Sequence, residues 1–306
     1  MPVALSTAWN SARHRDGEAM LQEAAELGFA AVELSHGIPF SLCPGILAAV
    51  AKKTVAVSSV HNFCPLPLGV YGDAPNCYQF SDPREAIRRA AIRHSLETFD
   101  FAVKVGAPAV VLHLGWAGPK GVTARLEKAW QQGALYARPN VRARVDAVVG
   151  RRRGFDALYG RVRACLDELV PAAKERGLRL GFENRADYAE FPDEVEMDRL
   201  LADYPPEVAG YWHDFGHGAR TALLGWHDHR ATLVRRQPRW IGAHIHDFVP
   251  PKRDHRPVGA GTIDFPALVP LLPRDAIQVL ELSPRVPRED VIKSRQTWHS
   301  FVNASA

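Results

Sequence analysis

The sequence predicts an α/β protein, a (β/α)8 TIM barrel formed by a single domain over residues 1–306. Short apolar or β-branched runs alternate with longer amphipathic runs, which is typical of βαβ units around a parallel sheet. Eight short runs can be counted, as a closed barrel of this class requires. With 46% hydrophobic and 24% charged residues, the composition is that of an ordinary globular chain with ample core material.

The predicted strands are the eight short runs at residues 3–6, 31–34, 55–60, 109–112, 179–182, 208–211, 240–243 and 277–280. Between them lie amphipathic helical patterns. The first places Leu21, Ala24 and Leu27 on one face and stops at Gly28, a residue that commonly ends helices. The clearest predicted helices are residues 17–27, 83–105, 156–176, 194–203 and 288–302.

Residues 118–154 are longer than a simple connection between a strand and a helix, and they carry helical patterns of their own. We therefore expect a helical insertion after the fourth strand, lying over the catalytic face of the barrel. Eight arginines fall between positions 138 and 163. Such a cluster can face phosphate, but a solvated helical surface is the commoner reason for it.

Charge and hydropathy restrict the partners of the chain. The N-terminal residues lack the basic segment and apolar run of a signal peptide, and no stretch approaches 18 uninterrupted apolar residues. We therefore expect a cytoplasmic protein without a membrane segment. A net charge of +4 gives no broad basic footprint, so nucleic acid is not an expected partner. A homodimer is expected on general grounds, because most soluble oligomers are symmetric dimers.

Metal-capable side chains stand at the carboxyl ends of the third to the eighth predicted strands, where the side chains of such a barrel point into a common site. They are His61, His113, Glu183, Asp214 with His217, His244, and Glu281. A single histidine there is more often a hydrogen-bonded core or loop residue than a ligand. Converging carboxylates differ, because burying them is too costly without a cation, an arginine or a proton.

Two sources of that counter-charge are open. Arg185 and Arg256 lie close in sequence to the candidate site, so a structural cluster of ion pairs is one interpretation. The other is a divalent metal, because carboxylate and imidazole ligands together suit Mn²⁺, Co²⁺, Zn²⁺ or Mg²⁺. We favour the metal, since a ligand set from four consecutive strands is compact and leaves room for substrate oxygens. The proposed ligands are Glu183, Asp214, His244 and Glu281.

Several motifs, in this order along the chain, resemble those of the xylose isomerase-like TIM barrels: GFEN, DFGH, HIHD and HRPVGAGTIDF. That group includes sugar phosphate isomerases, ketose 3-epimerases and apurinic endonucleases, and the resemblance runs from SHGI to ELSP. It implies that the four proposed ligands bind one divalent metal and that Asp247 orients the site. The further residues expected to bind substrate or a second metal are His61, His113, His217, His255, Asp247 and Arg256.

In the epimerase branch, the resemblance also implies that Glu183 and Glu281 are the catalytic pair that transfers protons, while the metal polarises a carbonyl group. The expected function is a divalent-metal-dependent isomerase or epimerase acting on a ketose or keto-sugar, with a small carbohydrate as partner. A dehydratase or lyase acting on a keto-sugar or keto-inositol would use the same groups and is an alternative. Ala260 stands where relatives often carry a glutamate, and this departure weakens a precise assignment to the isomerases.

A phosphodiesterase of the apurinic endonuclease type is the other alternative. The resemblance implies three zinc ions for that branch, and His61, His113 and His255 have counterparts there. Asp254 stands directly before His255 here and not two positions before it, so the ligand set of the third ion departs from the pattern. A non-catalytic barrel that binds a sugar or only scaffolds a complex is the third class, although such a protein has no physical reason to bury four ligands.

Overall fold

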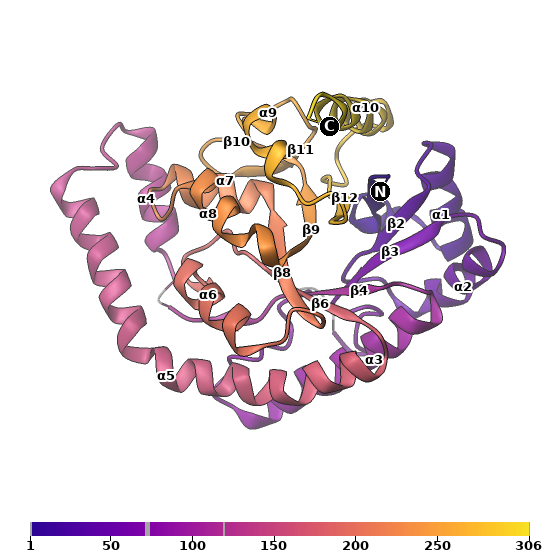
Figure 1. Cartoon of the computed structure of the whole chain (residues 1–306), viewed down its shortest axis with the longest axis horizontal. Helices are drawn as coiled ribbons and strands as arrows, with labels where there is room; N and C mark the ends of the chain where they lie inside the picture. The colour runs from indigo at the N-terminus through magenta and orange to yellow at the C-terminus, as the bar shows by residue number, and fades with distance from the viewer. Residues whose placement is uncertain (1, 71–73, 119, 306) are drawn as a thin grey trace.

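Eight parallel strands close into a barrel in the computed structural model, which describes residues 2–70, 74–118 and 120–305 (Figure 1). The strands follow one another around the barrel in chain order and the last pairs with the first, so the predicted (β/α)8 TIM barrel is confirmed. They are β1 (Ala4–Ser6), β2 (Ala31–Leu34), β3 (Ala56–His61), β4 (Ala109–Leu112), β6 (Arg179–Glu183), β8 (Ala209–Asp214), β9 (Trp240–Ile245) and β12 (Ile277–Leu280).

Four of these strands, β3, β6, β8 and β9, run further than the sequence predicts and take in the polar residue at the end, which in β9 is His244. His61, Glu183 and Asp214 are each the last residue of a strand. Backbone pairing holds them there, because Glu183 lies opposite Trp212 and Asp214 opposite His244. These side chains are therefore positioned by the barrel itself, which is more rigid than a loop.

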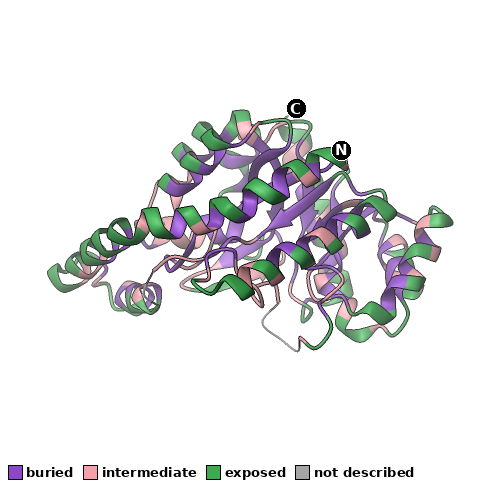
Figure 2. Cartoon of the chain, turned by 90° about the horizontal axis from the view of Figure 1, so that it is seen from below, coloured by how far each residue is buried: buried purple, intermediate pink, exposed green. Residues whose placement is uncertain are grey.

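Helices surround the barrel and turn buried faces toward the strands and exposed faces outward (Figure 2). None of the described helices combines the length and apolarity that a membrane crossing requires. The helices are α1 (Gly17–Glu26), α2 (Cys43–Ala51), α3 (Glu85–Lys104), α4 (Val122–Gln131), α5 (Arg138–Glu175), α6 (Glu194–Asp203), α7 (Phe215–Leu223), α8 (His229–Arg236), α9 (Phe265–Leu268) and α10 (Arg288–Ala304). Two short antiparallel pairs lie outside the barrel, β5 (Gly115–Trp116) with β7 (Glu190–Phe191) and β10 (Asp247–Val249) with β11 (Arg253–Arg256).

Helix α4 and the first half of α5 make up most of the segment that the sequence sets apart as an insertion. Helix α5 continues without a break across Gly154, where the sequence suggests a boundary, and runs along the lower edge of Figure 1. Tertiary contacts explain this continuity, because Arg151 is buried and donates hydrogen bonds to the carboxylate of Glu196 and the carbonyl oxygen of Glu190. The helix is thus anchored close to the glycine that would weaken it.

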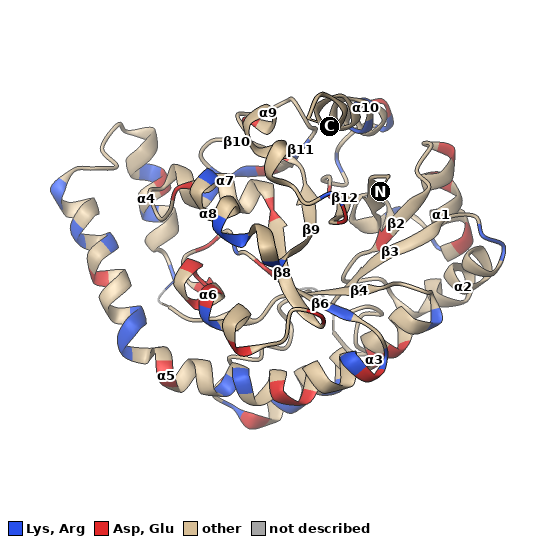
Figure 3. Cartoon of the chain, in the orientation of Figure 1, with Lys and Arg blue, Asp and Glu red and all other residues tan. Residues whose placement is uncertain are grey.

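The arginines of α5 alternate with acidic residues along the helix, as the blue and red bands in Figure 3 show. Arg142 pairs with Asp146 and Arg163 with Asp167, each one helical turn away, and all four side chains are exposed. This pattern is typical of a solvated helix surface and differs from the continuous basic stripe that binds a nucleic-acid backbone.

The indole ring of Trp212 fills the barrel interior below the candidate site and is wholly buried. Gly181 and Gly242, on the two strands beside it, provide the space. A Cβ atom at these glycines would lie 2.8 Å and 2.2 Å from atoms of the indole ring. The ring also packs edge-on against the imidazole of His244, with centroids 5.3 Å apart. The floor of the site is therefore close-packed and leaves little freedom to His244.

A methyl group at Gly242 tests this packing. We expect Gly242→Ala to lower the free energy of unfolding by about 1–3 kcal/mol, because the indole cannot move away inside a closed barrel. Gly160→Ala in α5 is the matched control. No atom lies within 4 Å of its Cβ position, so it should stabilise the protein by about 0.5–1 kcal/mol. Urea unfolding measures both changes, and equal stabilities of the two variants would contradict the packing argument.

Candidate metal centre

The carboxyl ends of six strands bring imidazole and carboxylate groups together, as the sequence predicts. The residues that converge are His61, His113, Glu183, Asp214, His244 and Glu281. Asn184, the last residue of the GFEN motif, fixes two of these strand ends relative to each other. Its side chain accepts a hydrogen bond from the backbone nitrogen of Asp214 and donates one to the carbonyl oxygen of the same residue.

The central cluster consists of Glu183, Asp214, His244 and Glu281. Nδ1 of His244 lies 3.4 Å from Oε1 of Glu183, 3.9 Å from Oδ2 of Asp214 and 3.3 Å from Oε2 of Glu281. One possible ligand atom each from Glu183, Asp214 and His244 lies within 4.8 Å of the other two. Three buried carboxylates around one imidazole nitrogen are a donor set that fits a divalent cation.

The charges of the central cluster stabilise one another. Burial alone would lower the pKa of His244, but the carboxylates of Glu281, Glu33 and Glu183 raise it well above its usual value. Burial raises the pKa of the Glu183 carboxyl, yet His113, Arg185 and His244 together hold it well below its usual range. Arg185 and a proton on His244 therefore supply the counter-charge. A divalent ion would replace that proton, because an imidazole ligand must be neutral.

Glu33 in β2 is a member of the site that sequence reasoning missed. Its two carboxylate oxygens each lie 3.1 Å from Nε2 of His244, on the far side of the imidazole from the central cluster. Ser6 and Ser59 donate hydrogen bonds to the same carboxylate. A carboxylate behind a metal-binding histidine orients the ring and makes it a stronger ligand. The available signal was a glutamate inside the otherwise apolar strand AVEL.

The upstream cluster consists of His61, His113 and Glu183. Oε2 of Glu183 lies 3.3 Å from Nε2 of His61 and 2.7 Å from Nε2 of His113. Glu183 therefore belongs to two clusters, with Oε1 facing the central cluster and Oε2 facing the two histidines. Nη1 of Arg185 also reaches this cluster and lies 2.5 Å from Nε2 of His113 and 3.4 Å from Oε2 of Glu183.

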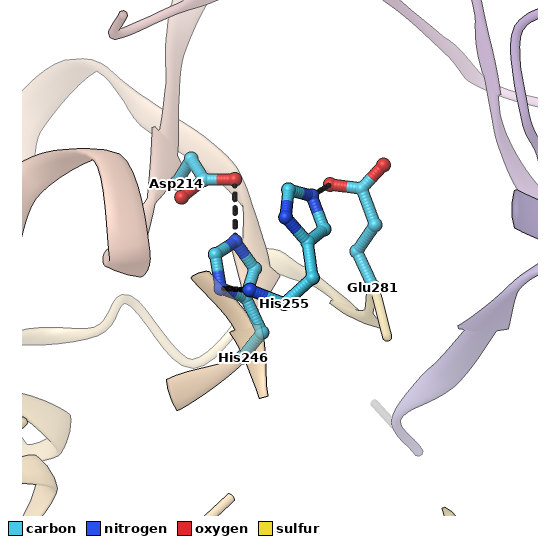
Figure 4. Close-up of side chains that lie close together, drawn as sticks. All are labelled: Asp214, His246, His255 and Glu281. Carbon is cyan, nitrogen blue, oxygen red and sulfur yellow. Dashed lines mark hydrogen bonds and ion pairs between the residues drawn. The ribbon is translucent and has the colours of Figure 1, made fainter. Parts of the chain in front are cut away.

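The outer cluster consists of Asp214, His246, His255 and Glu281 (Figure 4). Nε2 of His246 lies 2.9 Å from Oδ2 of Asp214, and Nε2 of His255 lies 3.5 Å from Oε2 of Glu281. The backbone nitrogen of His255 donates to Nδ1 of His246, so Nε2 of His246 carries the proton and donates it to Asp214. Both ring nitrogens of His246 are thus already used in hydrogen bonds within the protein.

His246 is a second site residue that sequence reasoning missed, because the HIHD motif matches the family pattern through His244 and Asp247. Its ring packs on Gly216 in the first turn of α7, where a Cβ atom would lie 2.1 Å from the imidazole. Gly216 is therefore required by close approach of this ring. His217, in the same turn, points back to the central cluster, with Nδ1 3.4 Å from Oε1 of Glu183 and 3.7 Å from Oδ2 of Asp214.

Asp247 and Arg256 lie beside the site but contact no member of the central cluster through a described hydrogen bond or ion pair. The carboxylate of Asp247 accepts four backbone N–H groups, those of Phe248, Gly259, Gly261 and Ile263. It shapes the loop that follows β11, and Gly261 is required there because its Cβ would lie 2.4 Å from the Asp247 carboxylate. Nε of Arg256 is buried without a hydrogen-bond partner among the described residues.

A cavity of about 400 Å³ opens on the centre from the side of β1 and β12, and His36, His255 and Glu281 line it. The ring of His36 stands 5.0 Å from that of His61, and burial lowers the pKa of His36 to about 3. No strand-end motif singles out His36, because it follows β2 by two residues. The cavity gives a small polar molecule access to the edge of the central cluster.

Comparison with models of protein families identifies the family of the chain. The family model of the xylose isomerase-like TIM barrel matches residues 21–299. The chain belongs to this family. The match spans the strands β3 to β12 that carry the three clusters, so the resemblance seen in the GFEN, DFGH and HIHD motifs is confirmed at the level of the family. A search of curated protein sequences finds no match.

Solved structures of family-like barrels superpose on most of the chain. A D-tagatose 3-epimerase-like protein has 17% identity and a TM-score of 0.71, covering 100% of this chain and 98% of its own. An L-ribulose 3-epimerase has 14% identity and a TM-score of 0.67, covering 100% and 96%. A 3-keto-D-glucoside 4-epimerase from E. coli has 16% identity and a TM-score of 0.66, covering 97% and 98%. At these identities the likeness establishes the fold.

Proposed function

We propose that this member of the xylose isomerase-like TIM barrel family is a divalent-metal-dependent sugar isomerase or epimerase, acting on a ketose or keto-sugar. The observation that carries the proposal is the pair of buried glutamates beside His244. Glu183 approaches Nδ1 of His244 from β6, the second strand away on one side of β9, and Glu281 approaches it from the end of β12, the adjacent strand on the other side. Two of the structural neighbours are named as sugar epimerases and a third as an epimerase-like protein, which supports the same chemistry.

The residue types suit proton transfer next to a carbonyl group. Such a carbon acid is far too weak for an unassisted carboxylate, so negative charge that develops on oxygen must be stabilised. A divalent ion held by the central cluster would supply that stabilisation by polarising the carbonyl. Neighbouring cations keep the pKa values of Glu183 and Glu281 well below their usual range, although burial raises both, so both are ionised and one accepts the proton.

Other residues of the centre position substrate in this proposal. His217 and His255 flank the central cluster, at 3.4 Å from Glu183 and 3.5 Å from Glu281 respectively. Imidazole groups there can hydrogen-bond the hydroxyl groups of a sugar, which offer both donors and acceptors. Arg256 is proposed to serve substrate as well, and Asp247 holds the adjoining loop in place.

A phosphodiesterase with several zinc ions is the second candidate. The upstream and outer clusters favour it, because each gathers at least three metal-capable groups beside the central cluster. Against it stand the hydrogen-bonded state of His246 and the mixed charges along α5. A keto-sugar or keto-inositol dehydratase or lyase would rest on the same central cluster, so the product of the reaction separates it from an isomerase.

Removing one central ligand tests the proposed metal centre. We expect purified protein to hold a divalent ion and Asp214→Ala to lose it, because Asp214 is wholly buried and is one of the four proposed ligands of the central cluster. Elemental analysis after dialysis measures the metal content. Asp146→Ala is the matched control, since Asp146 is exposed on α5 and should leave metal binding unchanged. A folded wild-type protein without metal, or an Asp214→Ala variant with normal metal content, would contradict the proposal.

A screen of candidate substrates tests the reaction type. Ketoses, keto-inositols and an abasic-site oligonucleotide are each incubated with the protein and Mn²⁺, Co²⁺, Mg²⁺ or Zn²⁺. We expect exchange of a carbon-bound proton with solvent deuterium and a new sugar epimer or isomer from a ketose or keto-sugar. Cleavage of the oligonucleotide alone, with about three zinc ions bound, would favour the phosphodiesterase. Loss of water from the sugar or keto-inositol would indicate a dehydratase.

A further inference from the structure

The upstream cluster contains three lone pairs that face one another. Nδ1 of His61 donates its hydrogen to the carbonyl oxygen of Asn62 at 3.0 Å, so in the neutral ring Nε2 carries a lone pair. Nδ1 of His113 lies 3.3 Å from Oδ1 of Asn76, which can only accept, so Nε2 of a neutral His113 ring also carries a lone pair. Both lone pairs point at Oε2 of Glu183, itself an acceptor, from 3.3 Å and 2.7 Å.

Three acceptors this close repel one another unless a proton or a cation lies among them. Metal-binding histidines commonly donate their other ring nitrogen to an oxygen, as both histidines do here. Ligand atoms around a zinc ion at about 2.0–2.2 Å are separated by similar spacings. The cluster therefore has the donor set and tautomers of a metal site, and it needs a proton or a cation among its three acceptors.

The positive charge present is the guanidinium group of Arg185. An arginine only donates, so Nη1 must give its hydrogen to the lone pair on Nε2 of His113, 2.5 Å away. The same nitrogen lies 3.4 Å from Oε2 of Glu183. The lone pair that a metal ion would need is therefore taken.

Arg185 is built into the fold. Its Nε and Nη2 atoms donate to Oε1 of Glu190 at 3.3 Å and 2.9 Å, and its side chain is only 7% exposed. The other oxygen of Glu190 accepts the backbone N–H of Asp187. Glu190 lies in β7, which pairs with β5 directly after the β4 strand end. Expelling Arg185 would break this paired anchor and leave Glu190 buried without its cation, which is costly.

We propose that Arg185 is the resident cation of the upstream cluster and keeps a divalent ion out of it. The inference rests on the proposed function, since it assumes that the central cluster holds the functional ion. Oε1 of Glu183, which faces His244, would then be left for that ion, while Arg185 neutralises Oε2. A consequence is that the upstream cluster contributes no zinc, which counts against a phosphodiesterase that needs metal ions in all three clusters.

Metal stoichiometry tests this inference without any substrate. Wild type, Arg185→Ala and Arg185→Met are dialysed against Zn²⁺ and then buffer, and zinc per chain is measured by elemental analysis. We expect both variants to bind one more ion than the wild type, because each removes the cation, and Arg185→Met also keeps most of the packing of the stem. In the Arg185→Met background, His113→Ala should remove the additional ion. Arg152→Ala, an arginine of α5 that does not contact the cluster, should bind as the wild type does.

A failure of the role inferred for Arg185 can be distinguished from a failure of the proposed central metal site. Variants that fold, by circular dichroism, and gain no zinc would overturn the role of Arg185 while leaving the central ion in place. A wild-type protein that loses an ion on His113→Ala would also overturn it, because the upstream cluster would then bind metal with Arg185 present. A wild-type protein with no metal at all would contradict the central cluster itself, and this inference with it. Co²⁺ absorption spectra provide a second count of the occupied sites.

Discussion

Glu183→Gln and Glu281→Gln are each expected to reduce turnover about 10²–10⁴-fold, the contribution of a positioned general acid or base. A glutamine keeps the size of the side chain and one oxygen that can bind a metal ion, but it cannot accept the proton of a carbon acid. KM should change far less than kcat, because the groups that hold the substrate remain. Steady-state kinetics at saturating metal, on whichever sugar the substrate screen identifies, measure both constants.

Metal content of the same two variants must be measured alongside the kinetics. Both glutamates face Nδ1 of His244, so a variant that has lost its metal would be inactive for a different reason. Glu168→Gln is the matched control. Glu168 is exposed on α5, where it pairs with Arg89, and its replacement should leave kcat and KM unchanged. Near-normal turnover in either Glu183→Gln or Glu281→Gln would rule out the proton-transfer pair.

The fold could be predicted because its pattern is local. Each barrel strand is a short apolar run flanked by turn residues, and each of the eight predicted runs overlaps an observed strand. The convergence of Glu183, Asp214, His244 and Glu281 followed from topology, since the ends of parallel barrel strands share one face. The structure brings these four side chains together, and their role as metal ligands stays a prediction.

What sequence reasoning missed depends on side-chain direction and on contacts between distant segments. Glu33 lies within β2, and only the closed barrel brings it to the far side of the His244 imidazole. His246 has the same residue type as His244 two positions earlier, and the packing on Gly216 decides which way it points. Arg185 could be named as a possible counter-charge because it lies two residues after Glu183 in the sequence. Its hydrogen bonds to Glu190, however, depend on how the loop folds.

The length of α5 was misjudged for the same reason, and the residue responsible carries a large expected effect on stability. Arg151 is 3% exposed, and it donates to the carboxylate of Glu196 and to the carbonyl oxygens of Tyr188 and Glu190. It therefore joins α5 to α6 and to the strand that anchors Arg185. Arg151→Ala should lower the free energy of unfolding by about 3–5 kcal/mol, because Glu196 stays buried and loses its main cation.

Urea unfolding of Arg151→Ala measures this loss, and Arg153→Ala is the control, since Arg153 is exposed on the same helix and should change stability by about 0.5 kcal/mol or less. The double variant Arg151→Met with Glu196→Gln separates charge from packing. It removes both buried charges, so it should be more stable than Arg151→Ala if the uncompensated carboxylate is the cause. A double variant as unstable as Arg151→Ala would show that the lost bonds to the carbonyl oxygens of Tyr188 and Glu190 dominate instead.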